Sequence, residues 1–435
     1  MDFYINTTTF REYLLLASKV ATRHIYSDQK EGVMIKLYAY PNLLEIEMNG
    51  ICDIIVTIRQ SQGYIYRSMG KAYVLADELL PALNSFCYVD EVHLFIRDGM
   101  LKLSPSCDEY DYIKIPRHPY PKEYPPVSVQ YNQESTINRE YFLRGLKIKY
   151  ACYHIPPRDF YGVGFEAINN TLKFGADGRR YNAIVEYVGG YKAITTNELK
   201  ASIGVSDIPT IIQVFEKDPC SYLEFKLLEK PFANILPHLL IKSDHVKLCI
   251  HGCTRCFDFR KTHKVLKYSY TYQIPAKVTD WECIANALTS SKYSFLPFTY
   301  LAKITTDLPQ GYIEIQSNSC VRMNRKVPFV LDTCVYDLAN DKTRKPWFSC
   351  SALFLIDMIN NNKRKNTVTM YFEDQTYADE YFSPPPVLFK FADETDQNGV
   401  TEKSLVFFDV SVAWDDKYLS RECESIRYRA EILDL

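Results

Sequence analysis

The sequence predicts an α+β fold of three consecutive domains, each built from two helices and antiparallel sheets. Segments with helical periodicity alternate with short apolar strand segments, so that one unit of a helix and strands recurs about six times, in three pairs. A proline-rich connector from Pro116 to Pro126 interrupts regular structure after the first pair. We therefore place the domains at residues 1–128, 129–274 and 275–435, with 414–435 as an extension beyond the last unit.

The composition is that of an ordinary soluble globular protein, with 435 residues, 47% hydrophobic and 24% charged. No apolar run reaches the roughly 18 residues of a membrane helix, and no export signal begins the chain. The 13 cysteines are odd in number and scattered, which favours reduced thiols and a cytoplasmic location. A net charge of −2 leaves any nucleic-acid contact to local clusters of Lys and Arg.

The first domain opens with an amphipathic helix predicted over 9–25, where Phe10, Leu14 and Ala17 share one face and Lys19 and Arg23 lie opposite. A second helix is expected over 76–86, with Asp77 in its first turn. The predicted strands are 33–40, 43–48, 51–59, 92–96, 100–103 and 110–115, with a turn at Asp98-Gly99 before the fifth of them.

The second domain begins with a helix expected over 138–150. Strands 165–168 and 171–174 flank Asn169-Asn170, a pair that tolerates positive φ and predicts a hairpin. A second turn is expected at Asp177-Gly178, before a strand over 183–187. The second half is predicted as strand 225–228, helix 230–242 with Pro237 inside it, and strands 245–251 and 256–260; residues 190–222 stay unassigned.

The third domain repeats the unit with a helix over 278–292 and another over 349–362. Lys363-Arg364-Lys365 follows the second helix, where cations suit the helix dipole. The predicted strands are 300–305, 311–316, 328–332, 367–372, 387–391 and 405–412.

One stretch carries a specific likeness. Arg158 with Gly162, the Phe165-Glu166 strand and the Ala176-to-Tyr181 turn (ADGRRY) resemble the middle domain of the bacterial DNA sliding clamp, the β subunit of the replicative polymerase. Arg179 stands where that family has His, and Tyr181 where it has Leu. The resemblance covers roughly residues 1–413 and indicates a divergent member, such as one encoded by a phage or mobile element.

The resemblance implies a non-enzymatic processivity factor. Two half rings join head to tail into a homodimer, with sheets outside and helices lining a hole that encloses double-stranded DNA without reading its sequence. The ring tethers a DNA polymerase and is opened by a clamp loader, both of which bind through short linear motifs, in the bacterial or host cytoplasm. The basic or polar side chains expected to face DNA are Lys19, Arg23, Arg144, Lys147, Lys149, His238, Lys242, Lys363, Arg364 and Lys365.

The same resemblance implies a pocket for partner peptides and an edge for dimerisation. The pocket residues carried over by position are Gly178, Arg179, Arg180, Tyr181, Val410 and Val412, although the family's C-terminal segment itself is missing here. The interface residues are Tyr110 and Tyr112 on an edge strand, and Ile284 and Leu288 on the 278–292 helix.

An alternative interpretation starts from Cys253 and Cys256, which have the Cys-x-x-Cys spacing of a zinc knuckle. A structural zinc site normally needs a second such pair, and a hairpin turn is expected at the same place, so we predict no metal and no cofactor. A zinc-containing or catalytic nucleic-acid protein, or a clamp-like scaffold that does not encircle DNA, remains the alternative. The sequence lacks a Gly-x-x-x-x-Gly-Lys loop, Gly-x-Ser-x-Gly and His-Glu-x-x-His, the motifs of common catalytic sites.

Overall fold

In the computed structural model the chain forms two compact units, which are described separately. Unit 1 comprises Met1–Leu143 and Thr195–Thr254, and unit 2 comprises Arg144–Ile194 and Arg255–Leu435. The structure describes residues 1–22, 33–49, 52–106, 110–119, 131, 133–152, 162–178, 181–189, 193–228, 238–251, 257–259, 264–290, 301–307, 312–317, 324–328, 345–373 and 386–408. Within these ranges no helix has the length and apolar character needed to cross a membrane.

Unit 1 contains three α-helices in its described part and begins a fourth. The helices are α1 (Thr7–Thr22), α2 (Ala76–Asn84), α4 (Ile208–Phe215) and the start of α3 (Arg139–Gly145), with the short 3₁₀ helix η1 (Gln60–Gln62). The strands are β1 (Asp2–Asn6), β2 (Met34–Ala39), β3 (Leu43–Met48), β4 (Cys52–Arg59), β5 (Tyr64–Ser68), β6 (Gly70–Leu75), β7 (Glu91–Arg97), β8 (Met100–Pro105), β9 (Ile113–Ile115), β10 (Gln133–Asn138), β14 (Leu199–Gly204), β15 (Tyr222–Leu228), β16 (His238–Lys242) and β17 (Val246–His251).

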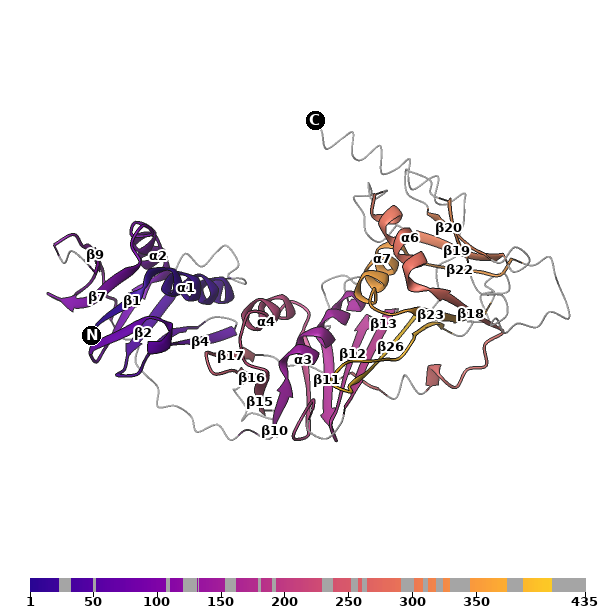
Figure 1. Ribbon diagram of the computed structural model, residues 1–435, viewed down its shortest axis with the longest axis horizontal. Coiled ribbons are helices and arrows are strands. Elements are labelled where there is room, and N and C mark those ends of the chain that lie inside the picture. Colours follow the sequence, from indigo (N-terminus) through magenta and orange to yellow (C-terminus); the bar gives the residue numbers. More distant parts are fainter. Residues whose placement is uncertain are drawn as a thin grey trace, which may run out of the picture. The chain divides into compact units, whose positions relative to one another are not determined.

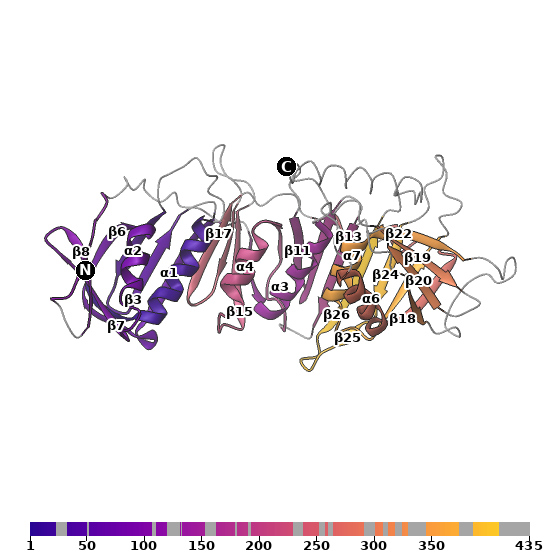
Figure 2. The same ribbon diagram turned by 90° about the horizontal axis from the view of Figure 1, so that it is seen from above.

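Two antiparallel sheets form unit 1, in the orders β5-β1-β7-β8-β9 and β10-β15-β16-β17-β4-β3-β2-β6. Helix α1 packs on β3 and β4 and fully buries Phe10, Leu14 and Ala17, the face expected from its periodicity. Figures 1 and 2 show α1, α2 and α4 on one side of the strands. The pairing of β17 with β4 places Val246 opposite Val56, so residues from the first and second predicted domains share one sheet.

Unit 2 contains the end of α3, the 3₁₀ helix η2 (Leu146–Cys152), α6 (Val278–Ser290) and α7 (Ala352–Asn361). Its strands are β11 (Gly162–Ile168), β12 (Thr171–Gly178), β13 (Tyr181–Val188), β18 (Tyr272–Lys277), β19 (Leu301–Asp307), β20 (Tyr312–Ser317), β21 (Asn324–Pro328), β22 (Trp347–Ser351), β23 (Thr367–Phe372), β24 (Val387–Phe391), β25 (Glu394–Thr395) and β26 (Thr401–Phe408).

The sheets of unit 2 are also antiparallel, in the orders β11-β12-β13-β26-β24-β23-β18 and β21-β20-β19-β22. Helices α6 and α7 pack against each other on one side of these strands (Figures 1 and 2). Trp281 of α6 is fully buried and meets Phe389 of β24 edge-on, with ring centroids 5.9 Å apart. The pairing of β13 with β26 joins residues of the second and third predicted domains.

A helix directly follows a strand in β1-α1, β6-α2, β10-α3, β18-α6 and β22-α7, and follows after three residues in β14-α4. These helices begin at 7, 76, 139, 208, 278 and 352, at intervals of roughly 70 residues. The recurring unit and the α+β class expected from the sequence are thus confirmed. No strand was expected directly before any of these helices, and the sixth helix was started early, at 349 rather than 352, within strand β22.

Two of the three expected turns that fall within the described residues are present. Asn169 and Asn170 have φ of 48° and 58°, and Asp98 and Gly99 have φ of 55° and 78°, the left-handed conformations that these residue types tolerate. The turn expected at Asp177-Gly178 is misplaced: both residues lie in β12, which pairs with β13 as far as Gly178 opposite Tyr181. Gly178 is required there for space: a Cβ would lie 1.9 Å from the carbonyl oxygen of Ala151.

The helix expected over 230–242 is wrong in its described part, because His238–Lys242 is strand β16. Leu239 and Ile241 are buried while Leu240 and Lys242, which alternate with them, are half-exposed, a period of two rather than 3.6. The fourth helix is α4, within the stretch left unassigned. Residues 257–259 are not a strand, and the 138–150 helix changes to 3₁₀ at Leu146. Of the strand expected over 328–332 only Pro328 is described, and it is the last residue of β21.

Candidate nucleic-acid interface

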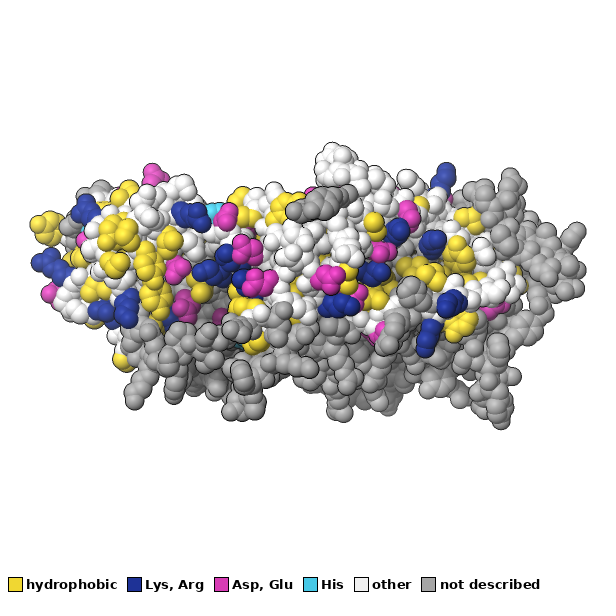
Figure 3. Space-filling model, turned by 90° about the horizontal axis from the view of Figure 1, so that it is seen from below, with side chains coloured by type: hydrophobic (Ala, Val, Ile, Leu, Met, Phe, Trp, Pro, Cys, Tyr) yellow, Lys and Arg dark blue, Asp and Glu magenta, His cyan; other side chains and the backbone are white. Residues whose placement is uncertain are grey.

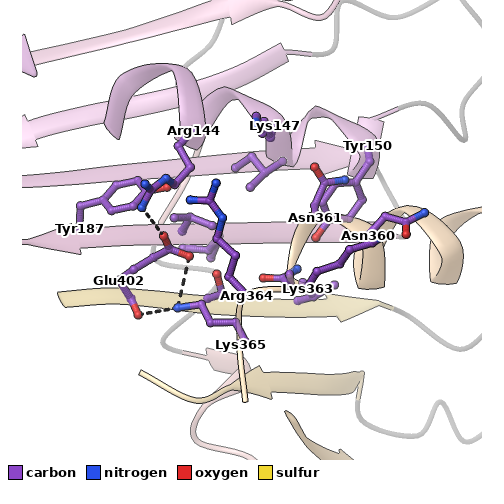
Figure 4. A pocket seen from close by; sticks show the side chains of 16 residues that line it. Arg144, Lys147, Tyr150, Tyr187, Asn360, Asn361, Lys363, Arg364, Lys365 and Glu402 are labelled. Atoms are coloured by element: carbon purple, nitrogen blue, oxygen red, sulfur yellow. Dashed lines mark hydrogen bonds and ion pairs between the residues drawn. The ribbon is translucent and has the colours of Figure 1, made fainter. Parts of the chain in front are cut away.

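A pocket of about 240 Å³ opens in unit 2 where η2, β13, β26 and the end of α7 meet. Five basic side chains and one carboxylate line this pocket (Figure 4). The lining residues are Arg144, Lys147, Ile148, Tyr150, Ile184, Val185, Tyr187, Asn360, Asn361, Asn362, Lys363, Arg364, Lys365, Glu402, Ser404 and Val406. The excess of positive charge makes the pocket a candidate site for phosphate groups.

The end of α7 delivers three of the basic residues to this pocket. Ser351 caps the start of this helix, and its hydroxyl accepts from the Phe354 N–H. Asn362 caps the end, and its Nδ2 donates to the Met358 carbonyl at 2.8 Å. The Lys365 N–H then donates to the Asn362 carbonyl at 3.0 Å, which closes a tight turn over 362–365. Buried Asn362 therefore fixes where the Lys363-Arg364-Lys365 run leaves the helix.

Tyr150 of η2 contacts both the turn over 362–365 and helix α7. Its side chain is hydrogen-bonded to Asn362, and burial raises the pKa of the phenol well above its usual value, so it stays neutral and keeps its proton. The ring also packs on Phe354 of α7 at 5.8 Å between centroids. η2 and α7 are thus held together at the pocket floor.

Glu402 of β26 holds the innermost cations in place. Its Oε2 lies 3.3 Å from Arg144 Nη1, and its Oε1 lies 3.2 Å from Lys365 Nζ, which also donates to the Glu402 carbonyl oxygen at 2.9 Å. Figure 4 shows both interactions, with Arg364 pointing towards the same carboxylate region. Lys365 is only 2% exposed, so its charge is compensated inside the protein.

The rim of the pocket carries cations that are more accessible. Lys147 and Arg364 are exposed, and neither forms an ion pair with any residue that the structure describes. Lys363 is paired with Glu282 of α6 at 3.1 Å, but both side chains are partly exposed and such pairs contribute little. The rim can therefore offer charge to an anionic ligand without breaking an internal bond of Lys147 or Arg364.

The charges on the sheets are arranged differently. Lysines there stand directly opposite glutamates on neighbouring strands, as in Lys226–Glu134, Lys242–Glu224, Lys36–Glu47 and Lys173–Glu186. Figure 3, seen from below, shows blue and magenta side chains interspersed on this side of the molecule. Compensated charges of this kind give no net attraction for phosphate, in contrast to the pocket.

Comparison with solved structures identifies the fold. The structure matches that of the β subunit of DNA polymerase from Streptococcus pyogenes with a TM-score of 0.70 at 13% identity, covering 95% of this chain and 100% of that one. The sliding clamps of Bacillus subtilis (0.70, 12%) and Caulobacter crescentus (0.68, 14%) match over the same shares. The chain has the bacterial sliding-clamp fold. No protein-family model matches the sequence, and no curated protein matches it by sequence, so the chain is a divergent example of the fold.

Five residues expected to face DNA come together in the pocket of this clamp fold: Arg144, Lys147, Lys363, Arg364 and Lys365. Lys149 lies half-buried on η2, and Lys19 is exposed in the last turn of α1 in unit 1. Arg23 lies outside the described residues.

Three of the residues expected to face DNA are placed differently from that expectation. His238 is 7% exposed on strand β16 rather than on the polar face of a helix, and its ring meets that of Tyr131 edge-on at 5.7 Å. Lys242, on the same strand, forms an ion pair with Glu224 at 2.7 Å. Lys365 belongs to the pocket but is buried, so it positions Glu402 rather than meeting a ligand directly.

Tyr181 of the expected peptide pocket is a core residue of unit 2. It is 8% exposed, its hydroxyl accepts from the Ser351 N–H at 2.9 Å, and its ring lies 4.1 Å from that of Phe354 and 5.6 Å from that of Phe408. Gly178 is also buried. Arg179, Arg180, Val410 and Val412 lie outside the described residues, so the peptide pocket stays a prediction.

The expected interface residues divide into two groups. Tyr110 and Tyr112 are 95% and 37% exposed beside β9, the edge strand of its sheet, which suits a contact surface. Ile284 and Leu288 of α6 are buried within the chain, so their assignment to an interface is wrong: they pack in the core, as an apolar helix face usually does. Cys253 and Cys256 lie outside the described residues.

Glu402, which organises the pocket, is not recognisable from the sequence. It is separated from Arg144 by 258 positions, and no local pattern links them. The sequence shows only a glutamate near the start of the last strand. It does not show that this glutamate lies beside the cations that follow α7.

Proposed function

We propose that this protein is a DNA sliding clamp, a processivity factor that encloses duplex DNA and tethers a DNA polymerase to it. The observation that carries the proposal is the match to clamp structures over 95% of this chain and the whole of each clamp. A shared fold does not by itself establish an activity, so the proposal also needs support from the chemistry of the site. The proposal assigns the protein no catalytic reaction of its own.

The pocket supports this proposal through its chemistry. Lys147 and Arg364 at its rim present uncompensated charge next to the Arg144–Glu402–Lys365 group, while the lysines of the sheets are paired with glutamates. A surface that binds the phosphate backbone without reading bases needs positive charge and no special arrangement of base-reading side chains. We infer that this pocket contacts backbone phosphates of the enclosed duplex.

The proposed ring is built from the three domains expected from the sequence. Three domains, at residues 1–128, 129–274 and 275–435, would form a half ring, and two copies would close head to tail through an edge that includes Tyr110 and Tyr112 of one copy. DNA polymerase and a clamp loader would bind by short linear motifs. Topological closure, rather than affinity, would then keep the protein on DNA.

Solution mass tests closure. Light scattering of the untagged chain should give twice the 50.6 kDa of one copy at micromolar concentration. Replacing Tyr110 and Tyr112 by Asp should shift the protein to monomer, whereas Tyr88→Asp, at another exposed tyrosine of unit 1, should leave the dimer intact. A wild-type monomer at all accessible concentrations would contradict the ring and favour a clamp-like scaffold that does not encircle DNA.

A further inference from the structure

Three side chains with different ligand atoms meet on one face of the eight-stranded sheet in unit 1. Asp53 lies on β4, and Cys249 and His251 lie on β17, and their ligand atoms are all within 4.8 Å of one another. Asp53 Oδ2 and His251 Nε2 are already 3.0 Å apart. All three side chains are half-buried, so the cluster is neither sealed in the core nor spread over open surface.

The strand register explains why they meet. Cys249 is directly opposite Asp53 across the β17–β4 pair, and His251 is two residues further along β17, which returns its side chain to the same face. His238 of β16 stands directly opposite His251, with ring centroids 6.1 Å apart. Antiparallel pairing alone therefore sets a thiol, a carboxylate and an imidazole side by side, with a second imidazole next to them.

We propose that Asp53, Cys249 and His251 form a binding site for a divalent transition-metal ion, for which Zn²⁺ is the best-suited ion. Thiolate and imidazole ligands favour zinc over magnesium or calcium, which prefer oxygen alone. Ligand atoms around a tetrahedral zinc ion lie roughly 3.2 to 3.7 Å apart, given bond lengths of about 2.0 to 2.3 Å. Rotation of the half-exposed Asp53 and His251 side chains closes the difference from the present spread.

Coordination replaces the bonds that these groups make without metal. The thiol proton of Cys249 passes to solvent as the sulfur–metal bond forms. The proton that His251 Nε2 donates to Asp53 also leaves Nε2, so that the ring binds as a neutral imidazole protonated on Nδ1, and the Asp53–His251 hydrogen bond gives way to two metal bonds. Three protein ligands leave a fourth position for water.

The proposed site spans the strand pair β17–β4, and this position indicates a structural role for the metal. Asp53 belongs to the first predicted domain and both other ligands to the second, and β17 with β4 is the strand pair that unites them in one sheet. A metal bound across this pair would fasten the two domains within unit 1. The inference does not depend on DNA binding, and it differs from the Cys253-Cys256 hypothesis because it uses neither of those cysteines.

The test uses the full chain without a histidine tag, purified from zinc-supplemented cells and dialysed. Inductively coupled plasma mass spectrometry should find one zinc ion per chain in the wild type. Added Zn²⁺ should raise the melting temperature of the metal-free protein. Cys249→Ser should lose the zinc and the temperature rise. Asp53→Asn, which keeps the shape and a hydrogen-bonding side chain, should bind zinc more weakly by more than about tenfold.

Cobalt gives a readout that a purely structural role of Cys249 would not change. Co²⁺ added to metal-free wild type should produce the near-ultraviolet absorption of a thiolate–cobalt bond, which Cys249→Ser should abolish and Asp53→Asn should retain at higher metal concentration. Cys87→Ser, at an exposed cysteine elsewhere in unit 1, and Cys253→Ser with Cys256→Ser should leave it unchanged.

Three outcomes overturn the proposal. They are a wild-type protein that binds no zinc, a Cys249→Ser variant that keeps both zinc and the cobalt absorption, and loss of metal only in the Cys253 and Cys256 double variant. If Cys249→Ser does not fold, as judged by circular dichroism, the weakened binding of Asp53→Asn decides the question alone.

Discussion

Neutralising the two rim cations of the pocket should weaken DNA binding in a measurable and specific way. Lys147→Gln combined with Arg364→Gln removes two exposed charges that form no ion pair with any described residue. Because no internal bond is broken, the free energy of unfolding should change by no more than about 0.5 kcal/mol per substitution. Any loss of DNA binding would then come from lost phosphate contacts.

The size of the effect follows from counterion release. Each phosphate contact contributes about 0.9 to the slope of log K against log salt concentration, so losing two contacts should lower that slope by about 1.8. Between 50 and 200 mM salt, the affinity of the wild type should therefore fall about tenfold more than that of the variant.

Fluorescence anisotropy with a short labelled duplex, titrated at several KCl concentrations, measures this slope. The matched control is Lys173→Gln with Lys226→Gln, which removes the same charge from the sheets, where each lysine faces a glutamate. The control should keep the wild-type slope. If both double variants lose the same slope, or the pocket variant loses none, then net charge rather than the pocket governs binding and the assignment fails.

Three further predictions concern stability. Gly178→Ala should destabilise unit 2 by about 1–3 kcal/mol in urea unfolding, because its Cβ would lie 1.9 Å from a backbone oxygen of η2; wild-type stability would disprove that contact. Tyr181→Phe should cost about 1–2 kcal/mol, because the buried Ser351 N–H loses its acceptor, and a neutral effect would contradict the hydrogen bond. In metal-free protein, the hydrogen bond to Asp53 raises the pKa of His251, so its stabilisation is present below the ordinary pKa of 6.5 and disappears as pH rises through the raised value. Melting curves of Asp53→Asn should lack this decline.

The sequence predicted the parts of the fold that depend on local periodicity. Helix α1 and strand β3 appear where expected because their apolar residues repeat with an unmistakable period. The run Leu239-Leu240-Ile241 fits both periods, and it was assigned to a helix although it forms strand β16. The missed helix α4 carries a proline in its first turn and starts about 70 residues after α3, two signals that would have located it.

The sites could be predicted only in part, because they depend on pairing between distant strands. The cations of the pocket were recognisable as helix-end residues, but the carboxylate that organises them was not. Asp53 and His251 are separated by 198 positions and meet only because β4 pairs with β17. Burial likewise decides that Ile284 is core and that Lys365 is enclosed, and neither follows from residue type.

Release from DNA on cutting tests encirclement most directly. The protein is loaded onto a closed circular plasmid with a loader extract, isolated in high salt with the plasmid by gel filtration, and then treated with a restriction enzyme that cuts once. If the protein is a sliding clamp, it should stay with the circle at high salt and leave within minutes of linearisation, while a mock digestion releases none. Equal retention on circular and cut DNA, or loss from both at high salt, would contradict the ring.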